Sequence, residues 1–198
     1  MSVVGKYRAE AERIGRDDVY KVLSRVPWEA PRTFREALQF FRIVHYALWL
    51  EGTYHVTCGR FDKYMYPYYK ADIDSGRLTD EEALDLVTDF FLSFNIDSDL
   101  YPGVQQGDNG QSMVLGGCDA DGNDWFTRLS EICLLASGKN KLIDPKINMR
   151  VSKSTPADRF VKGSRLTAVG MGFPQYSNDD VVIPGLEKLG YAHEDAAE

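Results

Sequence analysis

The segment Gly110-Gln-Ser-Met-Val-Leu-Gly-Gly117 decides the fold, because it sets a short apolar run between glycines. A run of this kind, Ser112 to Leu115, is typical of a buried β-strand. Residues Lys146-Ile-Asn-Met-Arg-Val151 alternate between polar and apolar side chains, which predicts a second strand. A helical pattern lies between the two, and strand, helix and strand in this order favour a parallel sheet.

Helical periodicity fills much of the remaining chain. Two of the predicted helices open on a Thr-x-x-Glu capping box, at Thr33 and at Thr79. Asn95 to Gly110 is polar and rich in Gly, Asp and Gln, so it is predicted as a loop. Residues 166–171 fit either a helix end or a strand. The helices expected from this pattern are 19–26, 33–52, 79–94, 125–137 with Gly138 as its C-cap, one that begins near Pro156, and 179–189.

The predicted α/β fold is incomplete in itself. Two or three short strands are few for 198 residues. A parallel sheet is normally covered on both faces, so a sheet this small indicates part of a larger structure. Residues 1–52 are expected to be mainly helical and residues 53–198 to mix helices and strands.

Composition points to a cytoplasmic protein that binds neither nucleic acid nor membrane. The formal net charge is −7, with 23 scattered basic residues against 30 acidic ones. No apolar run approaches the roughly 20 residues that span a bilayer, and Met1 to Gly15 carries charge throughout, unlike a signal peptide. Three cysteines at irregular spacing fit a reducing compartment better than a disulfide framework.

No metal site is predicted from residue spacing. Asp119 to Asp124 resembles a calcium loop, but its glycine stands at the fourth position and Ser130 stands at the twelfth. A turn before the next helix explains the same residues, and we favour it. His45 is expected in the core, and His55 lies in a short segment where side chains often face a pocket. His193 has no assigned role.

The cysteines are not predicted nucleophiles. Cys133 lies on an apolar helix face and is expected to act as a small hydrophobe. Cys58 and Cys118 each adjoin glycine, but the sequence places no histidine or carboxylate to activate either thiol. Residue chemistry alone therefore yields an acidic α/β protein with one candidate pocket near His55.

Six segments, in the right order, resemble the glycyl radical enzyme family of the pyruvate formate-lyase type. Together they run from about residue 20 to the end of the chain. They are Arg32-Thr-Phe-Arg-Glu-Ala-Leu-Gln39, Gly59-Arg-Phe-Asp-Lys-Tyr-Met-Tyr-Pro-Tyr-Tyr69, Asp72-Ile-Asp-Ser-Gly-Arg-Leu-Thr-Asp-Glu-Glu-Ala83, Gly110-Gln-Ser-Met-Val-Leu-Gly-Gly117 with Asp119-Ala-Asp-Gly122, Asp144-Pro-Lys-Ile-Asn-Met-Arg150, and Gly172-Phe-Pro-Gln-Tyr-Ser-Asn-Asp179.

The resemblance implies a helix-rich portion of a ten-stranded α/β barrel, with the barrel incomplete. Members of the family carry a glycyl radical, installed by an S-adenosylmethionine radical activase, that generates a thiyl radical on a cysteine at the barrel centre. A closed, dry cavity shields such an intermediate from side reactions. The family's cysteine loop and glycine loop would follow Glu198, so no catalytic residue is assigned here, and Cys118 does not occupy the thiyl position.

The resemblance also implies a pocket wall. Tyr54 and His55, just before Gly59-Arg60, occupy positions whose side chains contact substrate in related enzymes. Ser112 resembles a further pocket position, with a strand-end hydroxyl that satisfies the backbone as the alternative. For Arg60 and Asp62, buried structural pairing is favoured over catalysis.

The expected function is that of a fragment of a glycyl radical lyase, dehydratase or formate acetyltransferase relative that acts on a small hydroxylated or carboxylated metabolite. The fragment is expected to be inactive alone and to bind no cofactor itself. Expected partners are the remainder of the enzyme chain, the radical activase, the substrate and a second copy of the enzyme. The alternative is a non-enzymatic scaffold or interaction module derived from the same fold.

Overall fold

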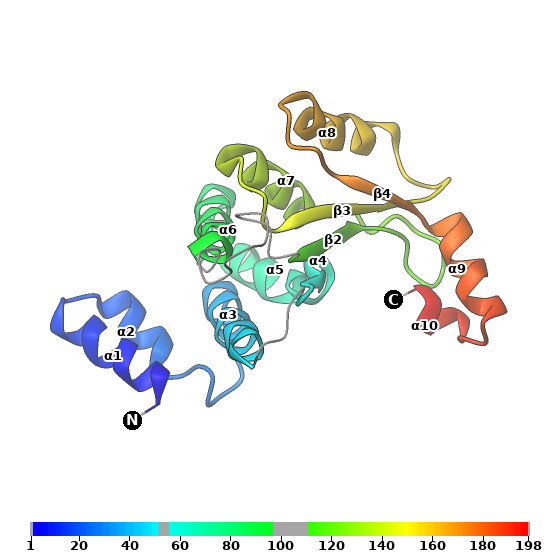
Figure 1. Ribbon diagram of the computed structural model, residues 1–198. Coiled ribbons are helices and arrows are strands. Elements are labelled where there is room, and N and C mark those ends of the chain that lie inside the picture. The colour runs from blue at the N-terminus through cyan, green and yellow to red at the C-terminus, as the bar shows by residue number, and fades with distance from the viewer. Residues whose placement is uncertain (1, 52–55, 97–110, 198) are drawn as a thin grey trace.

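The computed structural model describes residues 2–51, 56–96 and 111–197. Its elements follow the expected order of helices first and alternating strands and helices afterwards (Figure 1). They are α1 Val3–Arg13, α2 Asp17–Leu23, α3 Phe34–Leu50, β1 Gly59–Arg60, α4 Phe61–Tyr64, α5 Tyr66–Asp74, α6 Asp80–Asn95, β2 Ser112–Gly116, α7 Arg128–Asn140, β3 Lys146–Val151, α8 Ala157–Ala168, β4 Gln175–Asn178, α9 Asp179–Lys188 and α10 His193–Ala197.

The described strands form one parallel sheet in the order β1-β2-β3-β4. The expected strands β2 and β3 pair in register from Ser112 opposite Lys146 to Gly116 opposite Arg150. Strand β4 joins the far side of β3, where Gln175 lies opposite Asn148. The parallel α/β prediction is therefore confirmed, while β1 and β4 were not expected.

The hydrophobic core lies on one face of the sheet. Met113 and Leu115 from β2 and Ile147 and Met149 from β3 are fully buried. They pack with residues of α4, α6, α7 and α8 in one cluster. Helices α7 and α8 run along this side of the strands (Figure 1). Burial of this cluster is the main stabilising term of the fold.

Capping residues explain where two of the helices begin. In α6 the Thr79 side chain accepts a hydrogen bond from the Glu82 backbone and the Glu82 side chain accepts one from the Thr79 backbone, which confirms the predicted capping box. In α3 the Thr33 hydroxyl accepts from the Glu36 backbone, but the Glu36 carboxylate accepts from the Arg32 backbone instead of that of Thr33. The predicted box at Thr33 is therefore only half formed.

Helix α7 differs from its predicted bounds. It begins at Arg128, with Thr127 as N-cap, and it ends at Asn140, with Lys141 rather than Gly138 in the left-handed C-cap conformation. Gly138 lies inside the helix, where a Cβ would come within 3.0 Å of Leu166 Cδ2 in α8. The glycine thus permits close contact between α7 and α8 and does not end the helix.

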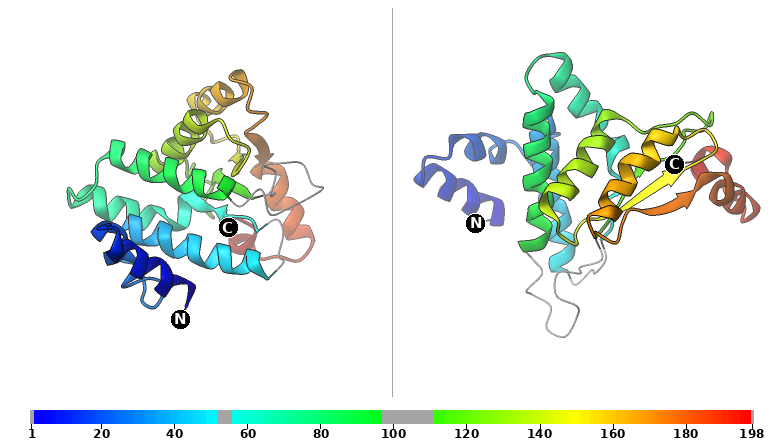
Figure 2. Two further views of the ribbon diagram at one scale, coloured as in Figure 1. Left: turned by 60° about the vertical axis from the view of Figure 1, so that its left-hand side comes forward. Right: turned by 90° about the horizontal axis from the view of Figure 1, so that it is seen from above.

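The two ends of the chain lie on opposite sides of the molecule. Helices α1 and α2 pack against each other beside α3, while α9 and α10 lie where the strands end (Figure 2).

Residues 166–171 include the end of helix α8, so of the two predicted alternatives for this segment, a helix end and a strand, the helix end is confirmed. Among the described residues, no helix has the length and apolar character needed to cross a membrane.

Candidate functional site

A polar surface covers the side of the sheet that faces away from the core. Side chains alternate along a strand, so the residues between the buried positions of β2 and β3 point to the opposite face. These residues are only partly buried, and those on β4 are exposed. We call this surface the polar face; it consists of Ser112, Lys146, Asn148, Arg150, Gln175 and Ser177, together with one apolar residue, Val114.

The amino-terminal edge of the polar face lies beside the segment that precedes β1. The Ser112 carbonyl accepts hydrogen bonds from the Cys58 backbone nitrogen at 2.6 Å and from the Thr57 hydroxyl at 2.9 Å. In the described part of the chain the Ser112 hydroxyl itself makes no hydrogen bond to the backbone. Tyr54 and His55 lie outside the described residues, so the predicted pocket of Tyr54, His55 and Ser112 stays a prediction.

Two arginines meet at the carboxyl-terminal edge of the sheet. Arg60 donates to the carbonyl oxygens of Ala197 at 2.8 Å and of Gly116 at 3.1 Å. Arg150 donates to the same Ala197 oxygen at 3.1 Å and forms an ion pair of 2.7 Å with the buried Asp179. The arginines therefore fix α10 against the ends of β1 and β3.

Asp62 is a buried carboxylate behind this edge. One of its oxygens accepts hydrogen bonds from the Gly116 backbone at 2.7 Å and from the Ser130 hydroxyl. Burial raises the pKa of Asp62 to about 6, although these hydrogen bonds and the charge of Arg60 act in the opposite direction. These contacts join α4, β2 and α7, which agrees with the structural role expected for Asp62.

The three thiols are held in their protonated form. Burial raises the pKa of Cys58 to about 12 and raises the pKa values of Cys118 and Cys133 as well. A thiol is a nucleophile only as the thiolate. The structure thus agrees with the expectation that none of these cysteines is an activated nucleophile at neutral pH.

The acidic segment from Asp119 to Asp124 is a turn. The Asp119 carboxylate accepts hydrogen bonds from the backbone nitrogens of Asp121 at 3.0 Å and Asn123 at 2.9 Å. This confirms the turn interpretation, with one correction: Asp119 caps its own turn, and the following helix is capped by Thr127. In the part of the chain that the structure describes, no group of three or more metal-binding side chains occurs.

Two of the histidines have structural contacts. His45 is buried in α3, and its Nε2 lies 3.0 Å from the Val56 carbonyl, as expected for a core histidine. His193, to which no role was assigned, links α10 to Glu187 of α9 at 2.6 Å and to the Ala120 carbonyl at 2.9 Å.

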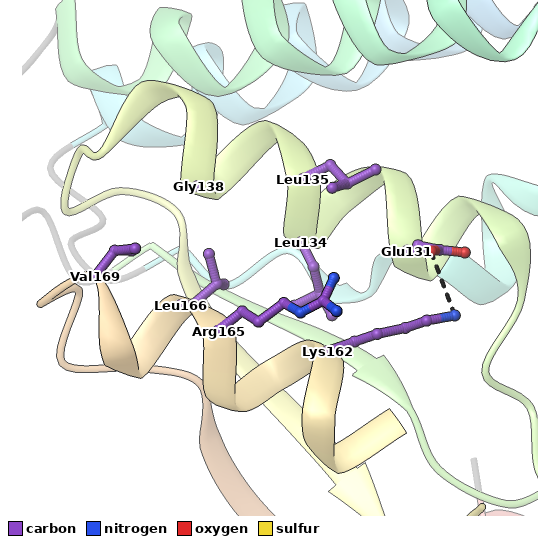
Figure 3. A pocket seen from close by; sticks show the side chains of 8 residues that line it. All are labelled: Glu131, Leu134, Leu135, Gly138, Lys162, Arg165, Leu166 and Val169. Atoms are coloured by element: carbon purple, nitrogen blue, oxygen red, sulfur yellow. Dashed lines mark ion pairs between the residues drawn. The ribbon is translucent and has the colours of Figure 1, made fainter. Parts of the chain in front are cut away.

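A surface groove separates the outer helices α7 and α8 (Figure 3). Its volume is about 220 Å³, and an ion pair of 3.3 Å between Lys162 and Glu131 crosses one end. Both helices cover the core side of the sheet, so the sheet itself separates this groove from the polar face. We therefore assign the groove no part in the candidate site. Its lining residues are Glu131, Leu134, Leu135, Gly138, Lys162, Arg165, Leu166 and Val169.

Comparison with known proteins identifies the family. A family model described as "Pyruvate formate lyase-like" matches residues 17–198. The chain belongs to this family. The 4-hydroxyphenylacetate decarboxylase glycyl radical subunit of Clostridioides difficile is 30% identical over an alignment of 172 residues, and the match covers 82% of this chain and 19% of that protein. The (2S)-3-sulfopropanediol dehydratase of Klebsiella oxytoca is 30% identical over an alignment of 173 residues, and the match covers 84% of this chain and 21% of that enzyme.

Solved structures of pyruvate formate lyase-like enzymes match the fold. The B12-independent glycerol dehydratase from Clostridium butyricum, solved with glycerol bound, superposes with a TM-score of 0.87 at 29% identity. The match covers 98% of this chain and 26% of that one. The chain therefore spans about a fifth to a quarter of the length of these relatives, and its sheet is an incomplete sector of their barrel.

Sequence reasoning missed most of the polar face. Lys146, Asn148 and Arg150 were placed on a strand, but their side of the sheet was not assigned a role. Gln175 and Ser177 were missed because Gln-Tyr-Ser-Asn has no apolar alternation. One available signal was the strict alternation of 146–151, which puts three polar side chains on one face.

Proposed function

We propose that this chain forms one sector of the barrel of a glycyl radical enzyme that acts on a small hydroxylated or carboxylated metabolite. The polar face carries this proposal, because within the described residues it is the side of the parallel sheet opposite the hydrophobic core, in a family of barrel enzymes. Parallel sheets are buried on both faces, so this side would line the interior once the remaining strands are present.

The proposed site at the amino-terminal edge consists of Tyr54, His55 and Ser112. The hydrogen bond from Cys58 to the Ser112 carbonyl supports it, because only two residues separate Cys58 from His55. Partly buried polar side chains in an enclosed site fix the orientation of a ligand. A structure in which these three side chains point into separate cores would contradict the assignment.

The proposal includes a radical activase and a glycyl radical in the complete enzyme. Relatives of this chain are glycyl radical subunits by name, and the activase requirement is what the family implies. The residues described here would bind and orient the substrate and exclude water. The radical-bearing groups would come from other parts of the enzyme.

The first test is on the 198-residue chain itself. Incubated anaerobically with a radical activase and S-adenosylmethionine, it is expected to give no turnover and no organic radical signal by electron paramagnetic resonance. The complete reading frame that contains these residues, treated in the same way, is expected to give that signal. A radical signal on the 198-residue chain would refute the proposed division of roles.

If the chain is instead a scaffold without activity, the gene is expected to differ in its reading frame after the codon for Glu198. Under our proposal the reading frame continues beyond Glu198 to a cysteine loop. A stop codon directly after Glu198, together with a monomeric and cooperatively folding product, would favour the scaffold.

A further inference from the structure

We propose that the groove between α3 and the pair α4 and α5 binds an apolar helix supplied by the remainder of the enzyme chain. This inference rests on the proposed function, because it requires a longer chain, and it adds the surface on which that chain docks. We call the surface the α3 groove. Its volume is about 340 Å³, and its lining residues are Pro31, Ala37, Phe40, Phe41, Val44, Tyr64, Met65 and Tyr68.

Helix α3 is apolar on two sides. One side is buried and includes Ala37 and Leu38, which belong to the hydrophobic core. On the other side Phe40, Val44 and Leu48 follow one another at intervals of four residues, which places them in one stripe along the helix. Val44 and Leu48 are exposed. A surface helix has one apolar side, whereas a helix that is apolar all round is buried, so the stripe indicates that a further segment covers α3.

Aromatic rings from α4 and α5 form the other wall of the α3 groove. Tyr64 stacks on Phe41 of α3, with ring centroids 6.0 Å apart and an interplanar angle of 17°. Its hydroxyl donates to the Cys58 carbonyl at 2.6 Å, so the ring is the part of Tyr64 left to face the groove. None of the residues that line the groove carries a charge. Permanent interfaces resemble a hydrophobic core in this respect, so the groove fits a permanent contact.

The exposed area of the α3 groove favours the remainder of the same chain over a second copy. A fully exposed aromatic side chain presents at most roughly 250 Å². The exposed fractions of Val44, Leu48 and Tyr64, which are 42%, 47% and 39%, therefore amount to about 320 Å² at most. A stable dimer interface needs about 800 Å² from each copy, which is more than twice this area.

A segment of the same chain needs less area, because the chain itself holds the segment near the groove and little translational freedom is lost. The chain spans 19% to 26% of the length of its relatives, so an enzyme of that length has most of its residues outside 1–198. An apolar helix face that packs into an apolar groove is a common mode of recognition. These observations together assign the α3 groove to a helix of that remainder.

The test compares the complete enzyme with the 198-residue chain, which is kept at submicromolar concentration. The rate at which a maleimide labels Val44→Cys is measured in both, with the rate in urea as the reference. Val182→Cys in α9 is the matched control, because Val182 is 43% exposed. In a second experiment, a photo-cross-linking amino acid replaces Leu48 in the complete enzyme. Mass spectrometry of peptides separates the label from that on the native cysteines, which are buried: Cys58, Cys118 and Cys133.

In the 198-residue chain, Val44→Cys should react within about 3-fold of the rate of Val182→Cys, because both positions are equally open to solvent. In the complete enzyme Val44→Cys should react at least about 10-fold more slowly, because labelling then requires local opening. The cross-linker at position 48 should join to a segment outside residues 1–198, and the product should have the mass of one chain on a denaturing gel. The radical yield by electron paramagnetic resonance should stay at the wild-type level, which shows that the probe variants fold.

The outcomes separate this inference from the proposed function. A complete enzyme that forms the radical while Val44→Cys reacts as fast as in the 198-residue chain would overturn the α3 groove as a docking site alone. A cross-linked product with the mass of two chains would identify a second copy as the occupant and would also overturn it, as would a cross-link to α1 or α2. A reading frame that stops after Glu198 would overturn the proposed function, and this inference with it.

Discussion

Asp62 makes a pH-dependent contribution to stability that a single substitution can isolate. Its side chain is fully buried, and burial raises its pKa from 3.8 to about 6. Because the pKa is higher in the folded state, the folded protein holds the proton more tightly than the unfolded chain. The destabilising effect of the buried charge is therefore complete above about pH 7, and it is relieved as the pH falls through 6 toward 4.

The size of the effect follows from the shift. A change of about 2 pKa units corresponds to roughly 3 kcal/mol between fully charged and fully protonated Asp62. Between pH 7.5 and 5.5 only part of this appears, about 0.8 kcal/mol for a folded pKa near 6. Asn in place of Asp62 keeps an oxygen acceptor for Gly116 and Ser130 but does not titrate. The free energy of unfolding of Asp62→Asn should therefore lack this pH-dependent contribution.

The assay is urea unfolding of the 198-residue chain at a submicromolar concentration, below that at which self-association is expected, followed by tryptophan fluorescence at pH 7.5, 6.5 and 5.5. These values stay above the sequence pI of about 5.0. Other titrating groups, such as His193 with its raised pKa, are common to both proteins and cancel in the difference. The wild type should gain about 0.8 kcal/mol relative to Asp62→Asn as the pH falls. A difference that stays constant with pH would refute a raised pKa of Asp62.

Three further predictions concern packing and association. Gly163→Ala should lower the free energy of unfolding by about 1–3 kcal/mol, because the added Cβ would lie 2.5 Å from Tyr176 Oη and 2.8 Å from Met149 Sδ. The control Gly185→Ala, in α9 with open space around it, should cause no such loss. Equal melting temperatures of the two variants would contradict the close packing at Gly163. Gln111→Met should raise the free energy of unfolding in urea by about 1 kcal/mol, because both amide atoms of the buried Gln111 side chain are without partners among the described residues. A lower stability of the variant would refute this and indicate that the Gln111 amide forms a hydrogen bond. The 198-residue chain should self-associate at micromolar concentration in sedimentation experiments, because β4 is an exposed edge strand; a cooperative monomer with little binding of a hydrophobic dye would count against the fragment interpretation.

The elements that could be predicted from sequence are those specified by local signals. Helix α6 combines a capping box with an apolar stripe, and both lie within the helix itself. The predicted start of α7 at Trp125 was wrong because the segment before Arg128 forms tertiary hydrogen bonds instead of helical ones. The Trp125 backbone nitrogen donates to the Gly117 carbonyl at 2.8 Å, and Cys118 pairs with Asp124 across the turn. A long-range bond of this kind leaves no trace in helical periodicity.

The site was predictable to the extent that it depends on strand alternation and on the family resemblance. Ser112 was assigned through the resemblance, and its position at the start of β2 was expected. Gln175 depends on pairing between β4 and β3, which nothing within Gln-Tyr-Ser-Asn specifies. The clamp of Arg60 and Arg150 on Ala197 joins residues more than forty positions apart, so the sequence could not indicate the partner of either arginine.

The sheet also explains why a sector of this barrel can fold locally yet depend on the rest for its site. Helices α6 and α7 and the buried side of β2 and β3 form one apolar cluster, so that side of the sheet is complete within the described residues. The polar face has the opposite character, since Lys146, Asn148 and Gln175 gain little from burial against each other. The core side therefore stabilises the sector, while the polar face would contact a substrate only when the barrel closes. This separation predicts that substitutions on the polar face, such as Asn148→Leu, change ligand binding more than stability, whereas substitutions such as Gly163→Ala do the reverse.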